Sequence, residues 1–88
     1  MKYKPKTQEI EAFRFGYDEM PRWFIDEISK ADVIIHGISE APQYCEINMH
    51  NWGAWAIADA GDYVVRYPDG YIAPIQYDRF IQLYEAVE

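Results

Sequence analysis

Alternation of apolar and polar residues is clearest between Tyr44 and His50. In an extended chain, Cys45, Ile47 and Met49 share one face and the residues between them share the other. This period of two is typical of a half-buried antiparallel strand. We therefore expect a strand here, with Cys45 on its buried face.

Other segments have the short, apolar or β-branched composition of strands, and turn residues separate them. They are Gln8–Phe15, Val33–His36, Trp55–Ala58, Tyr63–Tyr67 and Tyr71–Ile75. The last two flank Pro68-Asp69-Gly70, in which proline favours the second position of a type I turn and glycine supplies the positive φ that follows. We expect these two strands to form a hairpin. Pro74 lacks a ladder donor, which predicts an edge position for the second strand.

A helix is predicted over Pro21–Lys30. Its opening proline suits the first turn, and Asp18 and Glu19 lie where negative charge meets the positive end of the helix dipole. Phe24 and Ile28 are four residues apart, so they lie on the same side of the helix. We expect this apolar stripe to pack on a sheet.

Three shorter segments complete the chain. Ser39–Gln43 contains a proline and is predicted as a loop, and Tyr77–Phe80 fits a single helical turn. Ile81–Val87 either continues this helix or forms a final strand, and we favour the strand. Asp59–Asp62 is predicted as a turn, in which Asp62 accepts a local hydrogen bond.

Together these elements predict an α+β fold in one small domain. One main helix packs on a curved, mostly antiparallel sheet of about five to six strands. Residues 1–7 form a basic flexible arm, and residues 8–88 form the domain. Aromatic residues are 17% of the chain, which supplies the buried area that so short a domain needs.

The charge distribution narrows the classes of partner. Residues 7–88 carry 5 positive and 15 negative charges, a net charge of −10. Such a surface repels a phosphate backbone, so direct nucleic-acid binding is not expected. The chain has no apolar run of about 20 residues, which argues against a membrane span. A single cysteine and a polar, basic start predict a cytoplasmic protein.

Reactive side chains are few, and their spacing argues against catalysis. His36 and His50, with Cys45 and either Asp59 or Asp62, match no zinc-binding pattern, so no metal or other cofactor is expected. Cys45 and His50 fall on opposite faces of their strand, which separates a thiol from its only nearby base. We expect Cys45 to be a buried, unreactive hydrophobic residue and predict no catalytic residue.

Aromatic residues at turns are the strongest candidates for binding. Large side chains at turns are difficult to bury, and Trp, Tyr and Arg dominate the energetics of interfaces. The predicted binding residues are Asn51, Trp52, Arg66, Tyr67 and Tyr71. Trp55 and most of the tyrosines are expected in the core.

Both ends of the chain resemble a family of small phage and prophage proteins to which no function is assigned. The resemblance lies in the opening KYKPKTQEIEAFRF, in the Pro-x-Trp-Phe start of the predicted helix, and in residues 60–66, 68–70, 80 and 84–87. Ala60 stands where the family usually has proline, and Ile75 stands near its usual cysteine. The resemblance implies a phage or prophage origin and transfers no catalytic residue.

Two functions remain open at this point. In the first, which we favour, the protein binds a host protein and inhibits or redirects it, because acidic charge and exposed aromatic residues suit a basic or mixed surface. In the second, it sequesters a small nucleotide-like signal of a host defence, held by aromatic stacking and Arg66. A homodimer is compatible with both functions. An enzyme or a minor virion component is a weaker alternative.

Overall fold

The computed structural model describes residues 10–38, 41–49 and 53–84, and the α+β fold is confirmed for this part of the chain. The predicted basic arm at residues 1–7 lies outside it. No helix among the described residues is long and apolar enough to cross a membrane. The elements in chain order are β1 Glu11–Arg14, α1 Arg22–Ser29, β2 Val33–Ile38, β3 Ala41–Met49, β4 Ala54–Asp59, β5 Tyr63–Arg66, β6 Ile72–Ile75 and α2 Tyr77–Leu83.

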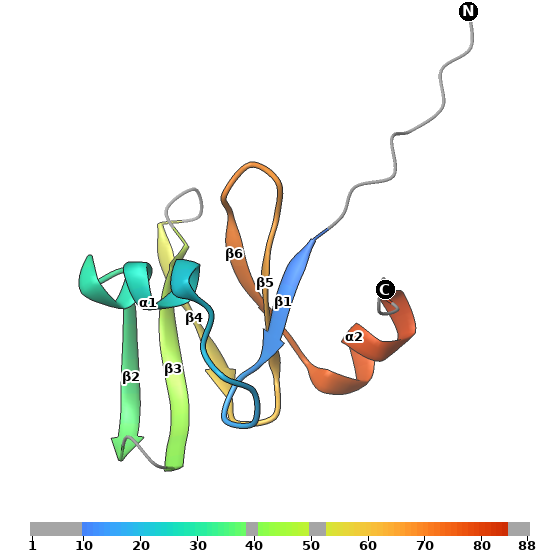
Figure 1. Ribbon diagram of the computed structural model, residues 1–88, viewed down its shortest axis with the longest axis horizontal. Helices are drawn as coiled ribbons and strands as arrows, with labels where there is room; N and C mark the ends of the chain where they lie inside the picture. Colours follow the sequence, from blue (N-terminus) through green and yellow to red (C-terminus); the bar gives the residue numbers. More distant parts are fainter. Residues whose placement is uncertain (1–9, 39–40, 50–52, 85–88) are drawn as a thin grey trace, which may run out of the picture.

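The strands form two antiparallel sheets of three strands each, with the orders β1-β5-β6 and β2-β3-β4 (Figure 1). The expectation of a single curved sheet is therefore wrong, although antiparallel pairing is confirmed. β1 pairs with β5 in one sheet, and among the described strands β2 pairs only with β3 in the other. Sequence separates β1 from β5 by about half of the chain, and local patterns do not reveal such a long-range pairing.

The predicted hairpin is confirmed in β5 and β6. Tyr67 donates its backbone N–H to the carbonyl of Tyr71 at 2.8 Å, and Gly70 donates to the carbonyl of Tyr67 at 2.8 Å. The carboxylate of Asp69 accepts the Tyr71 N–H at 3.0 Å. β6 is an edge strand, as Pro74 requires.

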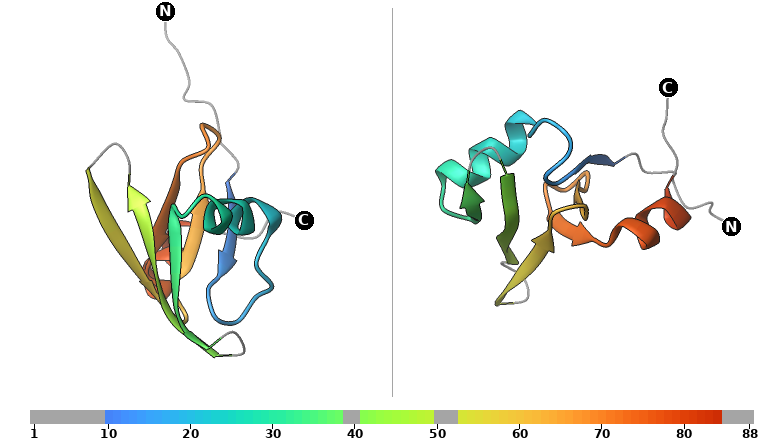
Figure 2. Two further views of the ribbon diagram at one scale, coloured as in Figure 1. Left: turned by 90° about the vertical axis from the view of Figure 1, so that its left-hand side faces the viewer. Right: turned by 90° about the horizontal axis from the view of Figure 1, so that it is seen from below.

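The core lies between the two sheets and beneath α1 (Figure 2). Phe24 of α1 is fully buried, and its ring centroid lies 4.7 Å from that of Phe13 and 6.3 Å from that of Phe15. Ile28 packs against the same cluster. The predicted Phe24/Ile28 stripe is therefore confirmed as the buried side of the helix.

The start of α1 differs from the prediction. Pro21 is the N-cap of the helix, and the first turn contains no acidic residue. Asp18 lies further back and accepts the backbone N–H of Arg14 at 2.8 Å. Its carboxylate therefore stabilises the loop after β1, and it does not meet the helix dipole.

The chain after β6 is helical where the strand was favoured. α2 extends to Leu83, so the strand predicted over Ile81–Val87 is wrong for its described part, and residues 85–87 lie outside the described range. Asp78 occupies the first turn, where it favours the helix through the dipole. The Phe80 ring stacks on Tyr63 with 3.8 Å between the ring centroids, and this tertiary contact favours the helix over a strand.

β3 begins earlier than expected. Its first residue is Ala41, so the predicted loop is wrong over residues 41–43. The register between β2 and β3 shifts at Gly37, which pairs with Pro42. Gly37 has φ +112°, and a Cβ there would lie 2.7 Å from the backbone nitrogen of Gln43. Only glycine allows the strands to continue pairing at this point.

Candidate interaction surface

α2 contacts the outward face of the β1-β5-β6 sheet through aromatic side chains (Figure 2). Tyr63 stacks on Phe80, and the guanidinium of Arg14 lies over the Tyr77 ring at 4.3 Å. Val65 on the same face is fully buried. Both faces of this sheet are therefore used in packing, because α1 and the core cover the other one.

β4, in contrast, places its small residues inward and its large ones outward. Ala58 is fully buried, whereas 46% of Trp55 and 56% of Ile57 are exposed to solvent. The register agrees, since Ala58 pairs with the buried Cys45, while Ile57 pairs with Glu46 on the other face. The expectation that Trp55 builds the core is wrong. The alanines let β4 approach the core closely, and the large apolar groups face water.

We call the bare side of β2, β3 and β4 the outer sheet face. Strand alternation and the register place the following residues on it: Ile34, His36, Tyr44, Glu46, Trp55 and Ile57. Ile34 is 41% exposed, so each of the two outer strands contributes a large exposed apolar side chain. No described helix covers this face, in contrast to the other sheet (Figure 1).

His36 and Tyr44 order the part of this face over β2 and β3. Their rings stack with centroids 4.4 Å apart. Nε2 of His36 is buried without a hydrogen-bond partner and lies 3.7 Å from Oε2 of Glu46. The stacked pair gives this part of the face a flat aromatic surface with a carboxylate beside it.

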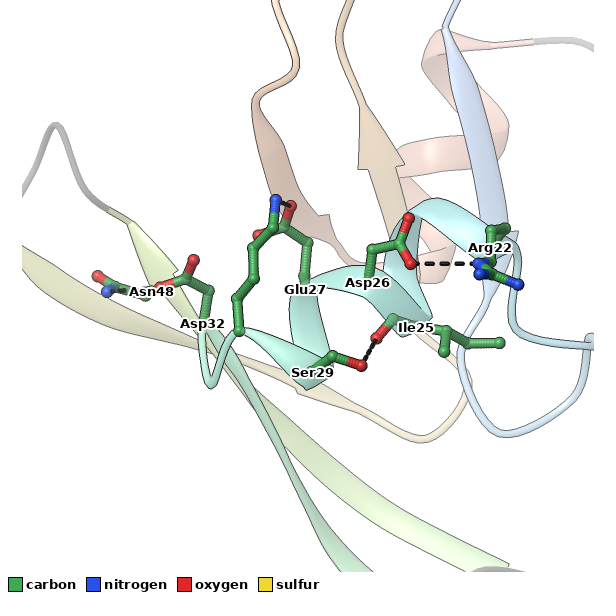
Figure 3. A network of polar contacts seen from close by, with 8 residues as sticks. Arg22, Ile25, Asp26, Glu27, Ser29, Asp32 and Asn48 are labelled. Atoms are coloured by element: carbon green, nitrogen blue, oxygen red, sulfur yellow. Dashed lines mark hydrogen bonds and ion pairs between the residues drawn. The ribbon is translucent and has the colours of Figure 1, made fainter.

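The outer sheet face carries no lysine or arginine side chain. β2, β3 and β4 contain no Lys or Arg and include the acidic residues Glu46 and Asp59. Two of the protein's cations lie on α1 or at its end, where Arg22 pairs with Asp26 at 3.2 Å and Lys30 pairs with Glu27 at 3.5 Å (Figure 3). The face is therefore apolar and negative.

Three of the five binding residues predicted from sequence are described, and they line two hollows. Asn51 and Trp52 lie outside the described residues. Arg66 and Tyr67 line a hollow of about 160 Å³, and Tyr71 lines a separate cleft of about 250 Å³. The prediction used the difficulty of burying large side chains at turns. This property does not determine whether two such side chains line the same hollow.

Neither hollow suits a nucleotide. Both are smaller than the roughly 300–1,000 Å³ of usual ligand pockets. The guanidinium of Arg66 lies 3.8 Å from the carboxylate of Glu11, which offsets its charge. The larger cleft is lined by Glu27, Asp32 and Asp69, whose charges repel a phosphate.

The side chain of Tyr67 forms a hydrogen bond with that of Tyr84. Burial raises the pKa of Tyr67, and Tyr84 raises it further through its charge and a side-chain hydrogen bond. This contact ties the hairpin to the residue that follows α2.

Cys45 is fully buried, as expected. Burial raises the pKa of its thiol from 9.0 to about 12; a backbone hydrogen bond from Ala58 lowers it, and the charges of Asp59 and Asp62 raise it. A buried neutral thiol is a poor nucleophile. Among the described residues, which do not include His50, no group of three or more His, Cys, Asp and Glu residues is placed to hold a metal ion.

Comparisons with models of protein families, with curated proteins and with solved structures give no match. The assignment of the surface therefore depends on its geometry. A signal for it is present in the sequence, because β4 alternates alanine with Trp55 and Ile57. Composition favours burying the larger pair, and only the register of β3 with β4 shows that the alanines face the core.

Proposed function

We propose that this chain is a non-catalytic binding protein that uses the outer sheet face to bind another protein. The inverted pattern of β4 is the observation that supports this most strongly. Trp55 and Ile57 are exposed on a strand whose alanine residues face the core. Large apolar groups that gather on one face of a small protein are typical of an interaction site.

The residue types suit an energetic centre of an interface. Tryptophan is the residue most enriched among those that dominate binding energy, and branched apolar neighbours exclude water around it. Ile34 on β2 and Ile57 on β4 both pair with Glu46 of β3, so exposed apolar groups lie on either side of a carboxylate. A partner with a complementary apolar surface would remove them from water together.

The charge of the outer sheet face defines the chemistry of its partner. The strands contain Glu46 and Asp59 but no Lys or Arg, so a partner with Lys or Arg around an apolar centre is complementary. A guanidinium can also lie over the exposed ring of Trp55. Nucleic acid and anionic ligands would be repelled by the same charges.

The biological setting of the proposal depends on sequence resemblance alone. The N-terminal and C-terminal residues that resemble small phage and prophage proteins support a role in the cytoplasm of a bacterial host. In this setting the partner is a host protein, which the chain inhibits or redirects by covering a basic and apolar surface.

Affinity capture with matched variants tests the proposal. Tagged wild-type protein, Ile57→Ala and Ile81→Ala are exposed to the same bacterial lysate, and captured proteins are identified by mass spectrometry. Ile57 and Ile81 are 56% and 53% exposed, so the two variants remove the same groups from different surfaces. We expect a protein that wild type and Ile81→Ala capture and Ile57→Ala does not. Equal capture by all three would contradict the proposal, as would a large rise in melting temperature with a nucleotide.

A further inference from the structure

β2 forms an open edge of its sheet. It pairs only with β3, and no other described strand lies along its far side (Figure 1; Figure 2, left). A free edge presents unpaired backbone N–H and C=O groups that can accept another strand. The edge is therefore a second feature, besides the outer sheet face, that can contact another chain.

The register identifies which backbone groups face outward. Asn48 donates its N–H to the carbonyl of Asp32 at 2.8 Å, which makes these two a hydrogen-bonded pair at the start of the β2–β3 ladder. Such pairs alternate along an antiparallel ladder, so Ile34 and His36 also bond to β3. The N–H and C=O of Ile35 consequently point away from the sheet.

The sequence of β2 lacks the features that usually protect an edge. The strand reads Val-Ile-Ile-His-Gly-Ile, with no Lys, Arg, Asp, Glu or Pro. Edge strands in other proteins are commonly blocked by lysine, proline or inward charges. In this protein Pro74 protects β6, and Glu11 and Arg14 lie on β1.

We propose that two copies of the chain pair antiparallel through their β2 strands, with a two-fold axis at Ile35. The Ile35 N–H of each copy would donate to the Ile35 carbonyl of the other. Ile34 of one copy would then lie opposite His36 of the second copy, and glycine at position 37 would lie opposite Val33. This pairing is isologous, which is the commonest arrangement of homodimers.

Burial and charge both favour a second copy of the chain as the partner of the β2 edge. Ile35 lies on the inner face and packs against the core, but it is only partly buried. In the dimer it would pack against its counterpart across the axis and lose its remaining exposure. β2 is uncharged, so the net charge of −10 over residues 7–88 does not place like charges at the junction. The resulting six-stranded sheet would place two outer sheet faces side by side.

Analytical ultracentrifugation of paired variants tests the dimer. We expect wild type to sediment at twice the 10.4 kDa of one chain. Ile35→Lys and Ile35→Glu should each be monomeric, because like charges would meet at the axis, and an equimolar mixture should form a heterodimer. Ile57→Lys, on the opposite edge strand, should remain dimeric. A monomeric wild type across the concentration series would overturn the inference, as would folded, dimeric Ile35→Lys.

Amide hydrogen exchange in wild type gives a second test that needs no variant. In a monomer, the amide of Ile35 should exchange rapidly, while those of Ile34 and His36 are protected by β3. In the dimer all three should be protected, and the protection of Ile35 should fall on dilution. Fast exchange at Ile35 at every concentration would overturn the inference. These outcomes are independent of whether the outer sheet face binds a partner.

Discussion

The two sheets of this protein have the same number of strands but use their outward faces differently. On the outward side of the β1-β5-β6 sheet, Phe80 of α2 stacks on Tyr63, and Val65 is fully buried. The β2-β3-β4 sheet leaves Trp55 and Ile57 in solvent. The first sheet therefore supports the fold on both faces. The second supports it on one face, and the other face exposes large apolar side chains.

Truncation of the buried Phe24 side chain on α1 should have the largest effect. Phe24 contacts Phe13 and Phe15 in the common core. We expect Phe24→Ala to lower the free energy of unfolding by about 3–5 kcal/mol, because the core cannot fill the cavity. Urea denaturation measures the change, and a loss below about 1 kcal/mol would show that the sheets do not depend on this residue.

A charge on the outward face of the β1-β5-β6 sheet should be nearly as damaging. Val65 lies on the same face of β5 as Tyr63 and has no exposure to solvent. Val65→Lys places an unpaired ammonium group there, and we expect a loss of about 3 kcal/mol or more. Far-UV circular dichroism during thermal unfolding reports the change. A variant as stable as wild type would mean that this side chain is not buried.

Burial of Cys45 on the inner face of the β2-β3-β4 sheet should make the stability of the protein depend on pH. The pKa of Cys45 is about 12 in the folded protein and 9.0 when exposed, so its contribution to stability is complete below pH 9 and falls as the pH rises towards 12. Wild type should lose about 1.4 kcal/mol per pH unit in this window relative to Cys45→Ala. Urea denaturation measures the free energy of unfolding of both proteins. An equal loss in wild type and Cys45→Ala would contradict the burial of Cys45, as would rapid labelling of native Cys45 by a thiol reagent.

The smallest effect on stability is expected on the uncovered outward face. Ile57→Lys makes the same kind of change as Val65→Lys, but at a side chain that is 56% exposed. We expect the free energy of unfolding to change by no more than about 0.5 kcal/mol. Thermal unfolding checks this value, and a loss comparable with that of Val65→Lys would remove the difference between the two sheets.

The sequence predicts local structure well in this protein because local physical constraints determine it. Pro68 and Gly70 define the hairpin, and the spacing of Phe24 and Ile28 defines the buried side of α1. The division into two sheets is not predictable in this way, since it depends on the pairing of β1 with the distant β5. Ile81–Leu83 continue α2 where a strand was favoured, because the helix is held by the stacking of Phe80 on Tyr63, which lies far away in sequence.

The candidate surface shows the same limit. Strand alternation shows that Trp55 and Ile57 share a face, but it does not show which face points to the core. Hydrophobicity favours burying them, and the register with Cys45 reverses that choice. Functional surfaces are the places where the usual pattern is expected to fail. Arg66 and Tyr67, chosen for their types, instead lie against Glu11 and Tyr84.

The affinity of a captured partner for Trp55→Ala tests the central claim most directly. The partner identified by affinity capture is purified and titrated by calorimetry against wild type, Trp55→Ala and the α2 variant Ile81→Ala. Because tryptophans at the centre of an interface supply much of its energy, we expect Trp55→Ala to weaken binding about tenfold or more with unchanged thermal stability. Ile81→Ala should bind as wild type does. Unchanged affinity in folded Trp55→Ala would contradict the assignment of the outer sheet face.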